Sequence, residues 1–374
     1  MATVMRTYEY KLYNSKRNKH LHSAIDVASE VWNYSIAMHR RYYKLFGKHL
    51  PATRLMKHIT RVKKREKYAH WKMLGSQAIQ DVVQRVDRSY QAFFAHHKKK
   101  HVGKKERKSP PKFRRRKRYN SFTLKQAGYS FGAGNCVTIM GKDYKYVNHR
   151  PFNGEIKTVT VKRTKAGELF IFVTCKEEMN QVLSRMGSSI GMDFGLKHFL
   201  TLSDGSVIDS PQWYKHSLKA VRSANKHLSR CKKGSNNRKQ ALLHLEQVHR
   251  RIRNQRKDWF FKLSYQLVGQ YATICIEDLN ISAMKKLWGR KVSDYAFAEF
   301  VKILEWVAFR NGTTVVKIDR FAPSSKACHV CGTVNKGLSL KDREWTCDSC
   351  HTHHDRDVNA AINIQMLGQK KLAA

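Results

Sequence analysis

Residues 328–364, CHVCGTVNKGLSLKDREWTCDSCHTHHDRDVNAAINI, are the stretch around which the rest of the chain is organised. They contain two CxxC pairs with the spacing of a four-cysteine zinc ribbon, Cys328/Cys331 and Cys347/Cys350. Each CxxC places two thiolates on one tight turn, and two facing turns make the closed tetrahedral site that structural zinc prefers. We therefore expect one structural Zn²⁺ ion here, followed directly by a helix with acidic residues in its first turn.

The chain is long and strongly basic. Its 374 residues are enough for two or three domains, and a hydrophobic content of 41% indicates a globular protein. A formal net charge of +45 would destabilise a compact chain by self-repulsion unless a polyanion screened it. Because this charge is spread along most of the chain, it favours nucleic acid over an anionic membrane as the partner. No apolar run reaches membrane-spanning length, and we expect no signal peptide because residues 1–20 lack its apolar core.

Four further cysteines are scattered singly along the chain: Cys136, Cys175, Cys231 and Cys275. Their surroundings are mostly apolar or basic, and they do not form a disulfide framework. The sequence therefore predicts a protein of a reducing compartment, the cytoplasm.

The N-terminal part of the chain changes from a strand pattern to a helical pattern. Residues 7–13, TYEYKLY, predict a strand, and helical periodicity then extends from about residue 15 to residue 101. In the second helical segment, polar residues share the side opposite the apolar ones: Gln77, Gln80, Gln84 and Arg88. Such side chains can read base edges in a groove, although an ordinary solvated helix face is the alternative for each of them.

A run of basic residues separates this helical block from a group of strands. Residues 98–118 are almost uniformly basic, which favours phosphate contact by Arg114, Arg115 and Arg116 over a merely solvated linker. Strand patterns follow in SFTL, CVTIM, IKTVTVKR and ELFIFVTCK. We expect a small β domain that the N-terminal strand joins, with the helical block inserted between its strands.

The second half of the chain predicts an α/β arrangement. Apart from the ribbon, its patterns follow the order β-β-β-α-β-α-β-α, which is the order of an RNase H-like fold. Residues 214–268 predict a pair of long basic helices. A later amphipathic helix, within residues 293–312, begins at a Ser-Asp pair and ends at Asn-Gly. The ribbon lies between the last strand and the last helix of this series.

Three carboxylates stand out because they lie on apolar elements of a chain with few acids. Asp193 lies in a strand between Met192 and Phe194, Glu277 ends the apolar run ICI, and Asp357 opens the last helix. An isolated carboxylate on a core element costs several kcal/mol unless it is paired or binds a metal. A cap or an ion pair is the alternative for Asp357 and Glu277 taken singly. Together, the three should converge at one end of the sheet.

Three convergent carboxylates suit two hard divalent cations, and Mg²⁺ fits best. Two such ions, about 4 Å apart, would activate water and stabilise the leaving 3′ oxygen in phosphodiester hydrolysis. We expect Asp193 to bridge both ions, and Glu277 and Asp357 to hold one each. Four other acids are weaker candidates, the last of them as a helix cap: Asp278, Asp294, Asp319 and Asp355.

Five motifs of the chain resemble those of a known family. The motifs GMDFGLKHFLTLSDG (191–205), CIEDLNI (275–281), SSKACHVCG (324–332), REWTC (343–347) and HDRDVNAAINI (354–364) occur in that order. They resemble the TnpB proteins of insertion-sequence transposons, RNA-guided DNA endonucleases related to the compact type V CRISPR effectors. The resemblance extends over nearly the whole chain.

The resemblance implies a multidomain α+β fold with a small β-barrel wedge domain and an RNase H-like (RuvC) nuclease domain. The wedge domain would comprise residues 1–14 and 103–186, and the helical recognition domain inserted in it residues 15–102. The nuclease domain would comprise residues 187–326 and 353–374. The zinc ribbon, residues 327–352, would be inserted in the nuclease domain and guide the target strand into its site.

The family's activity implies the partners and the remaining site residues. One chain would bind one guide RNA from the transposon end, recognise a short motif beside its double-stranded DNA target, and cut in a single RuvC-like site. The catalytic acids of the family correspond to Asp193, Glu277 and Asp357. The location would be a bacterial or archaeal cytoplasm, near the nucleoid and away from membranes. The motif would be read among Ser76, Gln77, Gln80 and Thr123.

The ribbon departs from the family pattern at one position. His351 follows Cys350 where the family usually has glycine, which alters one turn and leaves all four thiolates in place. We expect His353 and His354 to lie at the surface or contact phosphate, and not to bind the metal.

Two other functions compete with a guided nuclease. A guided DNA-binding regulator without cleavage would be favoured by loss of the acids, yet all three are present. An unguided nuclease that recognises DNA junctions needs less basic surface than a charge of +45 supplies.

Overall fold

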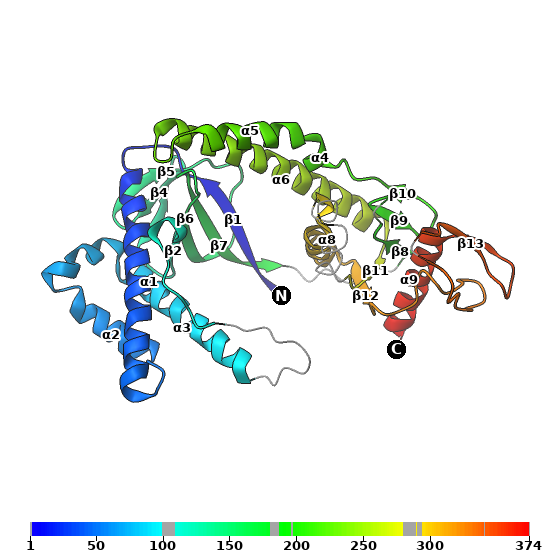
Figure 1. Ribbon diagram of the computed structural model, residues 1–374, viewed down its shortest axis with the longest axis horizontal. Helices are drawn as coiled ribbons and strands as arrows, with labels where there is room; N and C mark the ends of the chain where they lie inside the picture. The colour runs from blue at the N-terminus through cyan, green and yellow to red at the C-terminus, as the bar shows by residue number, and fades with distance from the viewer. Residues whose placement is uncertain are drawn as a thin grey trace. The chain divides into compact units, whose positions relative to one another are not determined.

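The computed structural model describes residues 2–98, 109–179, 187–195, 197–279, 289, 294–339 and 341–373 (Figure 1). The chain divides into two compact units, Met1–Asn180 and Gln181–Ala374. Each unit has a hydrophobic core of its own. Mixed α/β structure is confirmed for both units.

The first unit contains a four-stranded antiparallel sheet of order β1-β7-β6-β2. The strand β1 pairs with β7 along its whole length, which confirms that the N-terminal strand joins the later strands. A second sheet has three strands, β3, β4 and β5, which come from the chain between β2 and β6. A bridge between Leu12 and Tyr146 links the two sheets. The strands are β1 (Ala2–Lys11), β2 (Ser121–Leu124), β3 (Tyr129–Gly132), β4 (Cys136–Ile139), β5 (Lys142–Lys145), β6 (Glu155–Arg163) and β7 (Leu169–Met179).

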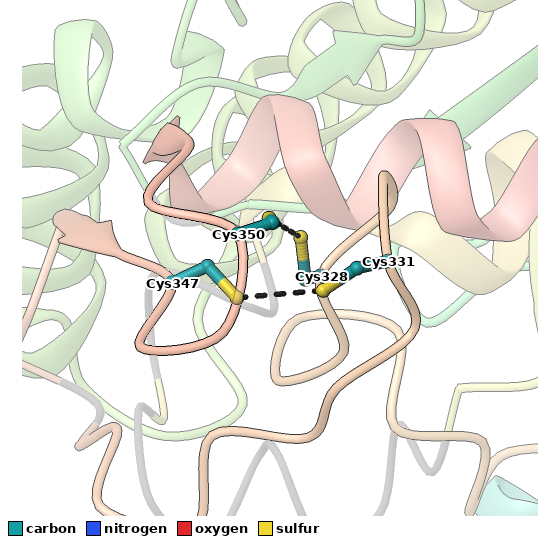
Figure 2. Close-up of side chains that lie close together, drawn as sticks. All are labelled: Cys328, Cys331, Cys347 and Cys350. Atoms are coloured by element: carbon teal, nitrogen blue, oxygen red, sulfur yellow. Dashed lines mark hydrogen bonds between the residues drawn. The ribbon is translucent and has the colours of Figure 1, made fainter.

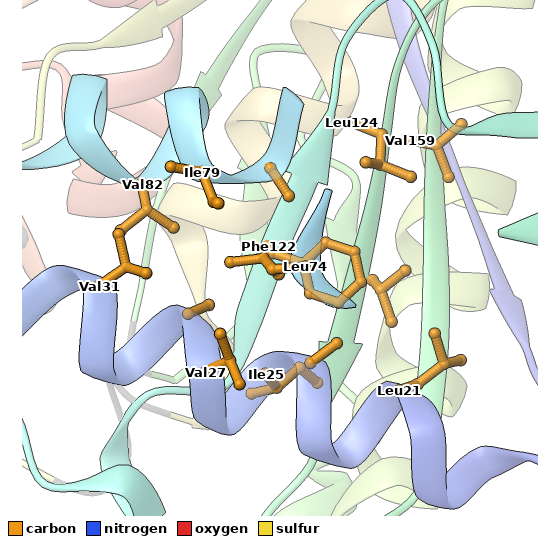
Figure 3. Packing of buried hydrophobic residues seen from close by; sticks show 14 of the residues in the cluster. Leu21, Ile25, Val27, Val31, Leu74, Ile79, Val82, Phe122, Leu124 and Val159 are labelled. Atoms are coloured by element: carbon orange, nitrogen blue, oxygen red, sulfur yellow. The ribbon is translucent and has the colours of Figure 1, made fainter. Parts of the chain in front are cut away.

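Helices fill the chain between β1 and β2, as the periodicity predicts. They are α1 (Asn18–Phe46), α2 (Ala52–Val62), the 3₁₀ helix η1 (Glu66–Leu74), α3 (Ser76–Lys98) and a short 3₁₀ turn, η2 (Arg116–Arg118). Apolar residues of α1 and α3 spaced three or four apart share one side, so both helices bury a continuous stripe. Figure 3 shows this packing, with Val31 and Val82 between the two helices and Phe122 of β2 beneath them.

The second unit contains a five-stranded sheet of order β10-β9-β8-β11-β12. The central strand β8 is antiparallel to β9 and parallel to β11, which is parallel to β12. Together with the helices, these strands confirm the predicted order β-β-β-α-β-α-β-α. The strands are β8 (Ser189–Asp193), β9 (Leu200–Leu202), β10 (Val207–Ile208), β11 (Thr273–Glu277) and β12 (Thr314–Ile318).

The helices of this unit follow the predicted pattern as well. The long basic pair is α5 (Leu218–Arg230) and α6 (Asn236–Gln270), preceded by the short α4 (Trp213–His216). The later helices are α8 (Phe297–Asn311) and α9 (Arg356–Ala373). Between β12 and α9 lie the four cysteines and a small hairpin of β13 (Glu344–Thr346) and β14 (His353–Asp355).

Alternation along β8 and β11 separates two faces of the sheet. Ile190, Met192, Ile274 and Ile276 pack in one cluster with residues of α6 and α8. The residues between them face α9 on the other side. A Cβ on Gly191 would lie only 2.0 Å from the carbonyl oxygen of Ala361, so glycine lets α9 touch the strand backbone.

Two local predictions are wrong. Asp193 is the last residue of β8 and not a mid-strand residue; two residues later, the backbone of Gly195 lies close to the carbonyl of His198. Asp294 does not cap α8, which begins at Phe297; its carboxylate accepts the N–H groups of Tyr214 (3.0 Å) and Lys215 (3.2 Å) at α4. Residue 293, the serine of the predicted pair, lies outside the described residues.

We expect Gly191→Ala to lower the free energy of unfolding of the second unit by about 2–3 kcal/mol, because the added methyl group overlaps the Ala361 carbonyl. Thermal unfolding of the purified protein measures this change. Gly269→Ala in α6 is the matched control, because nothing lies within 4 Å of its Cβ. Better helix propensity should make that variant as stable as the original or more stable. Equal melting of both variants would contradict the close approach of α9.

Candidate functional site

Asp193 and Glu277 end neighbouring parallel strands at the same level. Met192 of β8 is aligned with Ile276 of β11, so the next residue of each strand occupies an equivalent position. Adjacent strands lie about 4.8 Å apart, which brings the two carboxylates side by side. Asp193 lies two residues after Gly191, and Glu277 lies two residues after Cys275. Gly191 and Cys275 both contact α9. Because side chains alternate along a strand, Asp193 and Glu277 project toward the face of the sheet that α9 covers.

Asp357 reaches this place from the first turn of α9. The helix runs antiparallel to β8, since Ala361 lies against Gly191 while Gln365 donates to the Ser189 carbonyl at 2.8 Å. Asp357 lies one helical turn before Ala361, and Asp193 lies two residues after Gly191 in the strand. The packing of α9 thus brings the third carboxylate to the same edge of the sheet.

The electrostatics reflect this proximity. Burial, followed by the negative charges of Asp357 and Glu277, raises the pKa of Asp193 to about 7. Burial also raises the pKa of Glu277, with a further contribution from Asp278. Without a cation, ionisation of Asp193 and Glu277 is therefore unfavourable. A divalent cation would relieve both the burial cost and the repulsion.

Two arginines lie beside these acids, and the sequence patterns did not single them out. The Arg343 guanidinium nitrogen lies 3.5 Å from the Asp357 carboxylate oxygen. Arg356 lowers the pKa of Asp193 and donates to the carbonyl of Ser339 at 3.2 Å. Arginine presents a planar fork of donors that suits a phosphate, so positive charge is available at the edge of the site.

The weaker acidic candidates have other partners. Asp278 forms an ion pair with Arg320. Asp319 accepts the backbone N–H of Phe321 at 2.7 Å. Asp355 accepts the backbone N–H groups of Asp357 and Val358 at 2.9 Å each, which confirms that it caps α9.

The four cysteines form a compact cluster (Figure 2). Cys328 lies 3.5 Å from Cys350, and Cys331 lies 3.5 Å from Cys347, measured between sulfur atoms. Four thiolates around zinc, with Zn–S distances of about 2.3 Å, stand about 3.8 Å apart, so the cluster fits this ion. Among the described residues it is the one set of potential ligands whose atoms all lie within 4.8 Å of one another.

The two cysteine turns have the same backbone geometry. In the first, Gly332 N–H donates to the Cys328 carbonyl at 2.9 Å; in the second, His351 N–H donates to the Cys347 carbonyl at 2.9 Å. Both donors have left-handed backbones, with φ of +80° at Gly332 and +58° at His351. Glycine adopts this conformation without strain, whereas a residue with a side chain adopts it at a cost. His351 keeps the turn at an energetic cost.

Threonines stabilise the thiolates in both turns. A hydrogen bond from Thr333 lowers the pKa of Cys331 to about 6. In the second turn, a hydrogen bond from Thr352 lowers the pKa of Cys350. The thiolate is the form that binds zinc, so both contacts favour metal binding.

The prediction for His354 is wrong. Only 3% of its surface is exposed, and its Nε2 lies 3.1 Å from the Cys328 sulfur. Side chains alternate along β14, so His353 points to solvent while His354 packs between His329 and Trp345. His354 thus supports a cysteine of the cluster and does not contact phosphate.

Two asparagines of α9, Asn359 and Asn363, connect this helix to the cysteine cluster. The Asn359 amide donates to the Ala327 carbonyl at 2.8 Å, and its oxygen accepts the His329 N–H at 3.0 Å. Asn363 donates to the carbonyls of Ser324 and Ala327. Sequence reasoning missed both residues; the available signal was a pair of amides four residues apart on an otherwise apolar helix face.

The residues expected to read a DNA motif lie on α3 and β2. Ser76 and Gln80 are exposed and Gln77 is partly exposed at the start of α3. Thr123 is only 9% exposed, and its hydroxyl is already bonded to Arg85 (2.6 Å) and Thr160 (2.8 Å). Thr123 therefore lies beneath the surface, where its hydroxyl supports Arg85 and Thr160.

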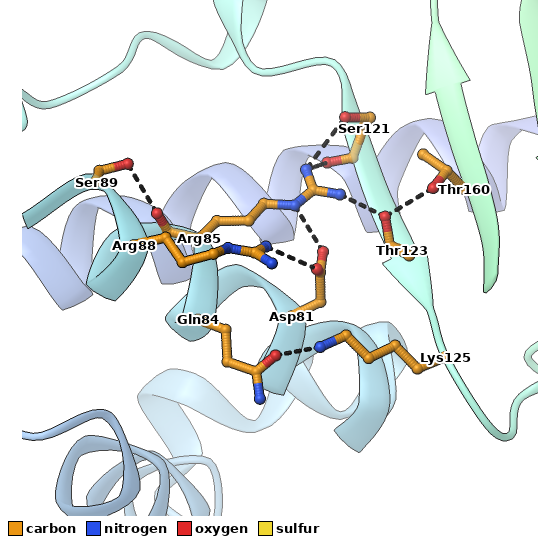
Figure 4. A network of polar contacts seen from close by, with 9 residues as sticks. All are labelled: Asp81, Gln84, Arg85, Arg88, Ser89, Ser121, Thr123, Lys125 and Thr160. Atoms are coloured by element: carbon orange, nitrogen blue, oxygen red, sulfur yellow. Dashed lines mark hydrogen bonds and ion pairs between the residues drawn. The ribbon is translucent and has the colours of Figure 1, made fainter. Parts of the chain in front are cut away.

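Arg85 belongs to a polar network that joins α3 to β2 (Figure 4). Asp81 pairs with Arg85 at 2.7 Å and lies 3.8 Å from Arg88. Gln84 accepts a hydrogen bond from Lys125. This network positions the exposed polar side of the helix.

Arg114, Arg115 and Arg116 lie along α1. The Arg114 guanidinium stacks 4.2 Å over the Trp32 ring, and Arg116 pairs with Glu30. The Asn33 side chain bonds both the N–H and the carbonyl of Arg114. All three arginines remain exposed, so their charge is held on the surface of the first unit.

Comparison with known proteins identifies the family. Over 98% of the chain, 31% of residues are identical to a Streptomyces pristinaespiralis protein named "Putative RNA-guided DNA endonuclease", 90% of which is covered. The chain belongs to the TnpB family. InsQ of Escherichia coli K12, which bears the same name, is 25% identical over 92% of this chain and 87% of its own length.

Two family models match different parts of this TnpB chain. A model described as a probable transposase, OrfB_IS605, matches residues 172–287, which include Asp193 and Glu277. A Cas12f1-like TNB domain model matches residues 297–364, which include the cysteine cluster and Asp357. The fold resembles that of the protein in a Cas12f1–sgRNA–target DNA complex, with a TM-score of 0.55, 13% identity, and coverage of 97% of this chain and 99% of the other.

Within the part of this TnpB chain that the structure describes, no helix is long and apolar enough to cross a membrane.

Metal-free protein should lose stability as pH rises from about 4 to about 7. The folded state holds a proton on Asp193 with a pKa of about 7, whereas the unfolded chain releases it near the ordinary value of 3.8. Asp193→Asn removes this effect, so it should raise the melting temperature more at pH 8 than at pH 5. Melting with a chelator of divalent cations that leaves zinc bound measures the difference. An equal change at both pH values would contradict the raised pKa.

His351→Gly should increase the stability of the zinc-loaded ribbon by about 1 kcal/mol, because glycine adopts the left-handed turn without strain. Chelator competition should show slower zinc loss, and thermal melting should shift upward. The reciprocal control is Gly332→Ala, which should weaken zinc retention by a similar amount. If neither variant changes zinc loss, backbone strain in these turns is not a determinant of ribbon stability.

Proposed function

We propose that this chain is an RNA-guided DNA endonuclease that hydrolyses phosphodiester bonds with Asp193, Glu277 and Asp357. The observation that carries the proposal is the meeting of these three acids at one sheet edge, where their repulsion and burial raise the pKa of Asp193 to about 7. Acids arranged so unfavourably for the empty site are expected where a cation binds. The names of the relatives at 31% and 25% identity support the same activity.

The donor set fits two Mg²⁺ ions, because all its atoms are hard carboxylate oxygens. Asp193 at the end of β8, Glu277 on the neighbouring strand and Asp357 on α9 would together hold the ions, with Asp193 as the shared ligand. When bound, such ions supply an activated water and stabilise the leaving 3′ oxygen. Asp193 must give up its proton before it can serve as a ligand. Arg343, beside Asp357, would orient the phosphate of the strand to be cut.

The domain arrangement follows from the same proposal. Residues 1–14 and 103–186 would form the β-barrel wedge domain around the helical recognition domain, residues 15–102. The RuvC-like nuclease domain, residues 187–326 and 353–374, would carry the zinc ribbon, residues 327–352, as the target-strand-loading domain. One Zn²⁺ on the four cysteines would hold the ribbon against α9, where Asn359 and Asn363 fasten it.

Guide RNA and double-stranded target DNA are the proposed partners, with one chain for each RNA. A formal charge of +45 provides the basic surface that an RNA and a heteroduplex require. Ser76, Gln77 and Gln80 are available for reading a motif next to the target, with Thr123 in support. Arg114, Arg115 and Arg116 would contact phosphate. A bacterial or archaeal cytoplasm, close to the nucleoid, would be the place of action.

A nuclease-silent regulator guided by RNA is the alternative. It would need the same basic surface and the same ribbon. It has no need for three acids at one sheet edge, where burial and the neighbouring negative charges raise the pKa of Asp193, so their presence favours the nuclease.

Purified with its co-expressed RNA, the protein should cut matched double-stranded DNA in Mg²⁺, and sequencing the copurified RNA should reveal the transposon end. Asp193→Asn should bind the target normally and cut at least about 100-fold more slowly, since even residues that only support metal ligands contribute 10- to 100-fold. The control Asp258→Asn changes an exposed acid of α6, paired with Lys262 at 2.9 Å, and should cut normally. Cutting that survives RNase treatment during purification would reject the guided mechanism.

A further inference from the structure

Phe321 is the most exposed of the large hydrophobic residues that the structure describes. Its exposed fraction is 86%, while the others, such as Phe309 at 54%, remain partly covered. A single exposed aromatic ring is ordinary on a protein surface, so its position and its anchoring decide whether it has a role.

Its position is next to the proposed active site. Ile318, the last residue of β12, pairs with Glu277 of β11, and Phe321 follows three residues later. Three residues reach at most about 10 Å, so the ring stands within a few nucleotides of the acids along a bound strand. Arg320, its neighbour, is turned toward Asp278, the residue after Glu277.

The loop that carries Phe321 is anchored on both sides. The Phe321 N–H donates to the Asp319 carboxylate at 2.7 Å, and the Ala322 N–H donates to the Asp319 carbonyl at 3.2 Å. Ala322 then packs against the cluster of β11, β12 and α9 residues, and Ser324 is buried. The ring is therefore held out from the surface by an ordered backbone.

The exposed neighbours of the ring along the chain are mostly charged. They are Asp319, Arg320, Pro323 and Lys326, so Phe321 does not belong to a continuous apolar stretch of the sequence. An unpaired nucleobase matches this chemistry, because its flat face stacks on an aromatic ring while its phosphates stay near basic side chains. Stacking does not depend on the identity of the base. A nuclease whose guide RNA selects the target must accept any base at this position.

We propose that Phe321 is a stacking platform for an unpaired base of the DNA strand that enters the active site. This inference rests on the proposed nuclease function. The ring makes Phe321 a positioning residue: it fixes the strand so that a phosphodiester bond lies over Asp193, Glu277 and Asp357.

The RNA complex of the Phe321→Ala variant should show a KM for target DNA raised about 5- to 100-fold, the loss expected for one stacked base. Phe321→Trp should retain cutting. Phe309→Ala, which removes an exposed ring from α8, is the matched control and should cut normally. Melting of Phe321→Ala should be unchanged because the ring is mostly solvated.

A spectroscopic readout separates stacking from a general defect. Target strands with 2-aminopurine placed within a few nucleotides of the mapped cut are bound to RNA complexes in the Asp193→Asn background. Fluorescence should be quenched at one position when residue 321 is Phe or Trp, and recover when it is Ala.

Normal cutting by Phe321→Ala, or quenching that does not depend on the ring, would overturn the stacking proposal and leave the nuclease intact. Loss of self-association without loss of quenching would assign the ring to a protein interface and overturn it as well. Absence of cutting by the unmodified complex would instead reject the proposed function itself.

Discussion

The contact between α9 and the central strands is the constraint on which the second unit depends. Gly191 on β8 and Gly368 on α9 lack the Cβ atoms that would otherwise strike Ala361 and Cys275. Because nothing separates helix from sheet there, Asp357 lies over the ends of β8 and β11. A helix held farther away by a side chain would leave Asp357 farther from Asp193 and Glu277.

This close packing also explains why the Asp193 carboxylate is difficult to ionise in the metal-free site. A buried acid with two acidic neighbours keeps its proton to about pH 7, so the fold opposes full ionisation of the metal-free site. The same α9 that brings the third acid carries Asn359 and Asn363, which bind the backbone before and within the first cysteine turn. One helix thus joins the acidic site to the cysteine cluster. Zinc on the cysteines would stiffen the segment that includes Arg343, beside Asp357.

Much of this organisation could be predicted from local patterns. The CxxC pairs, the alternating strands, the helical stripes of α1 and α3 and the cap at Asp355 are decided within a few residues of the chain. Predictions were weaker where a side chain's role depends on its neighbours in space. His354 looked like a surface residue, yet the hairpin register turns it toward Cys328. Thr123 looked available to DNA, yet Arg85 from α3 occupies its hydroxyl.

The sequence by itself determined which chemical groups exist and which local elements carry them: four thiolates on two turns, and acids at two strand ends and one helix start. Tertiary structure alone decided that the acids meet, that Asn359 and Asn363 tie helix to ribbon, and that Phe321 stands free beside the site. The physical reason is distance along the chain. Residues 193 and 357 are brought together because α9 packs on the sheet. The periodicity of a helix or strand in the sequence does not determine how closely the helix approaches the sheet.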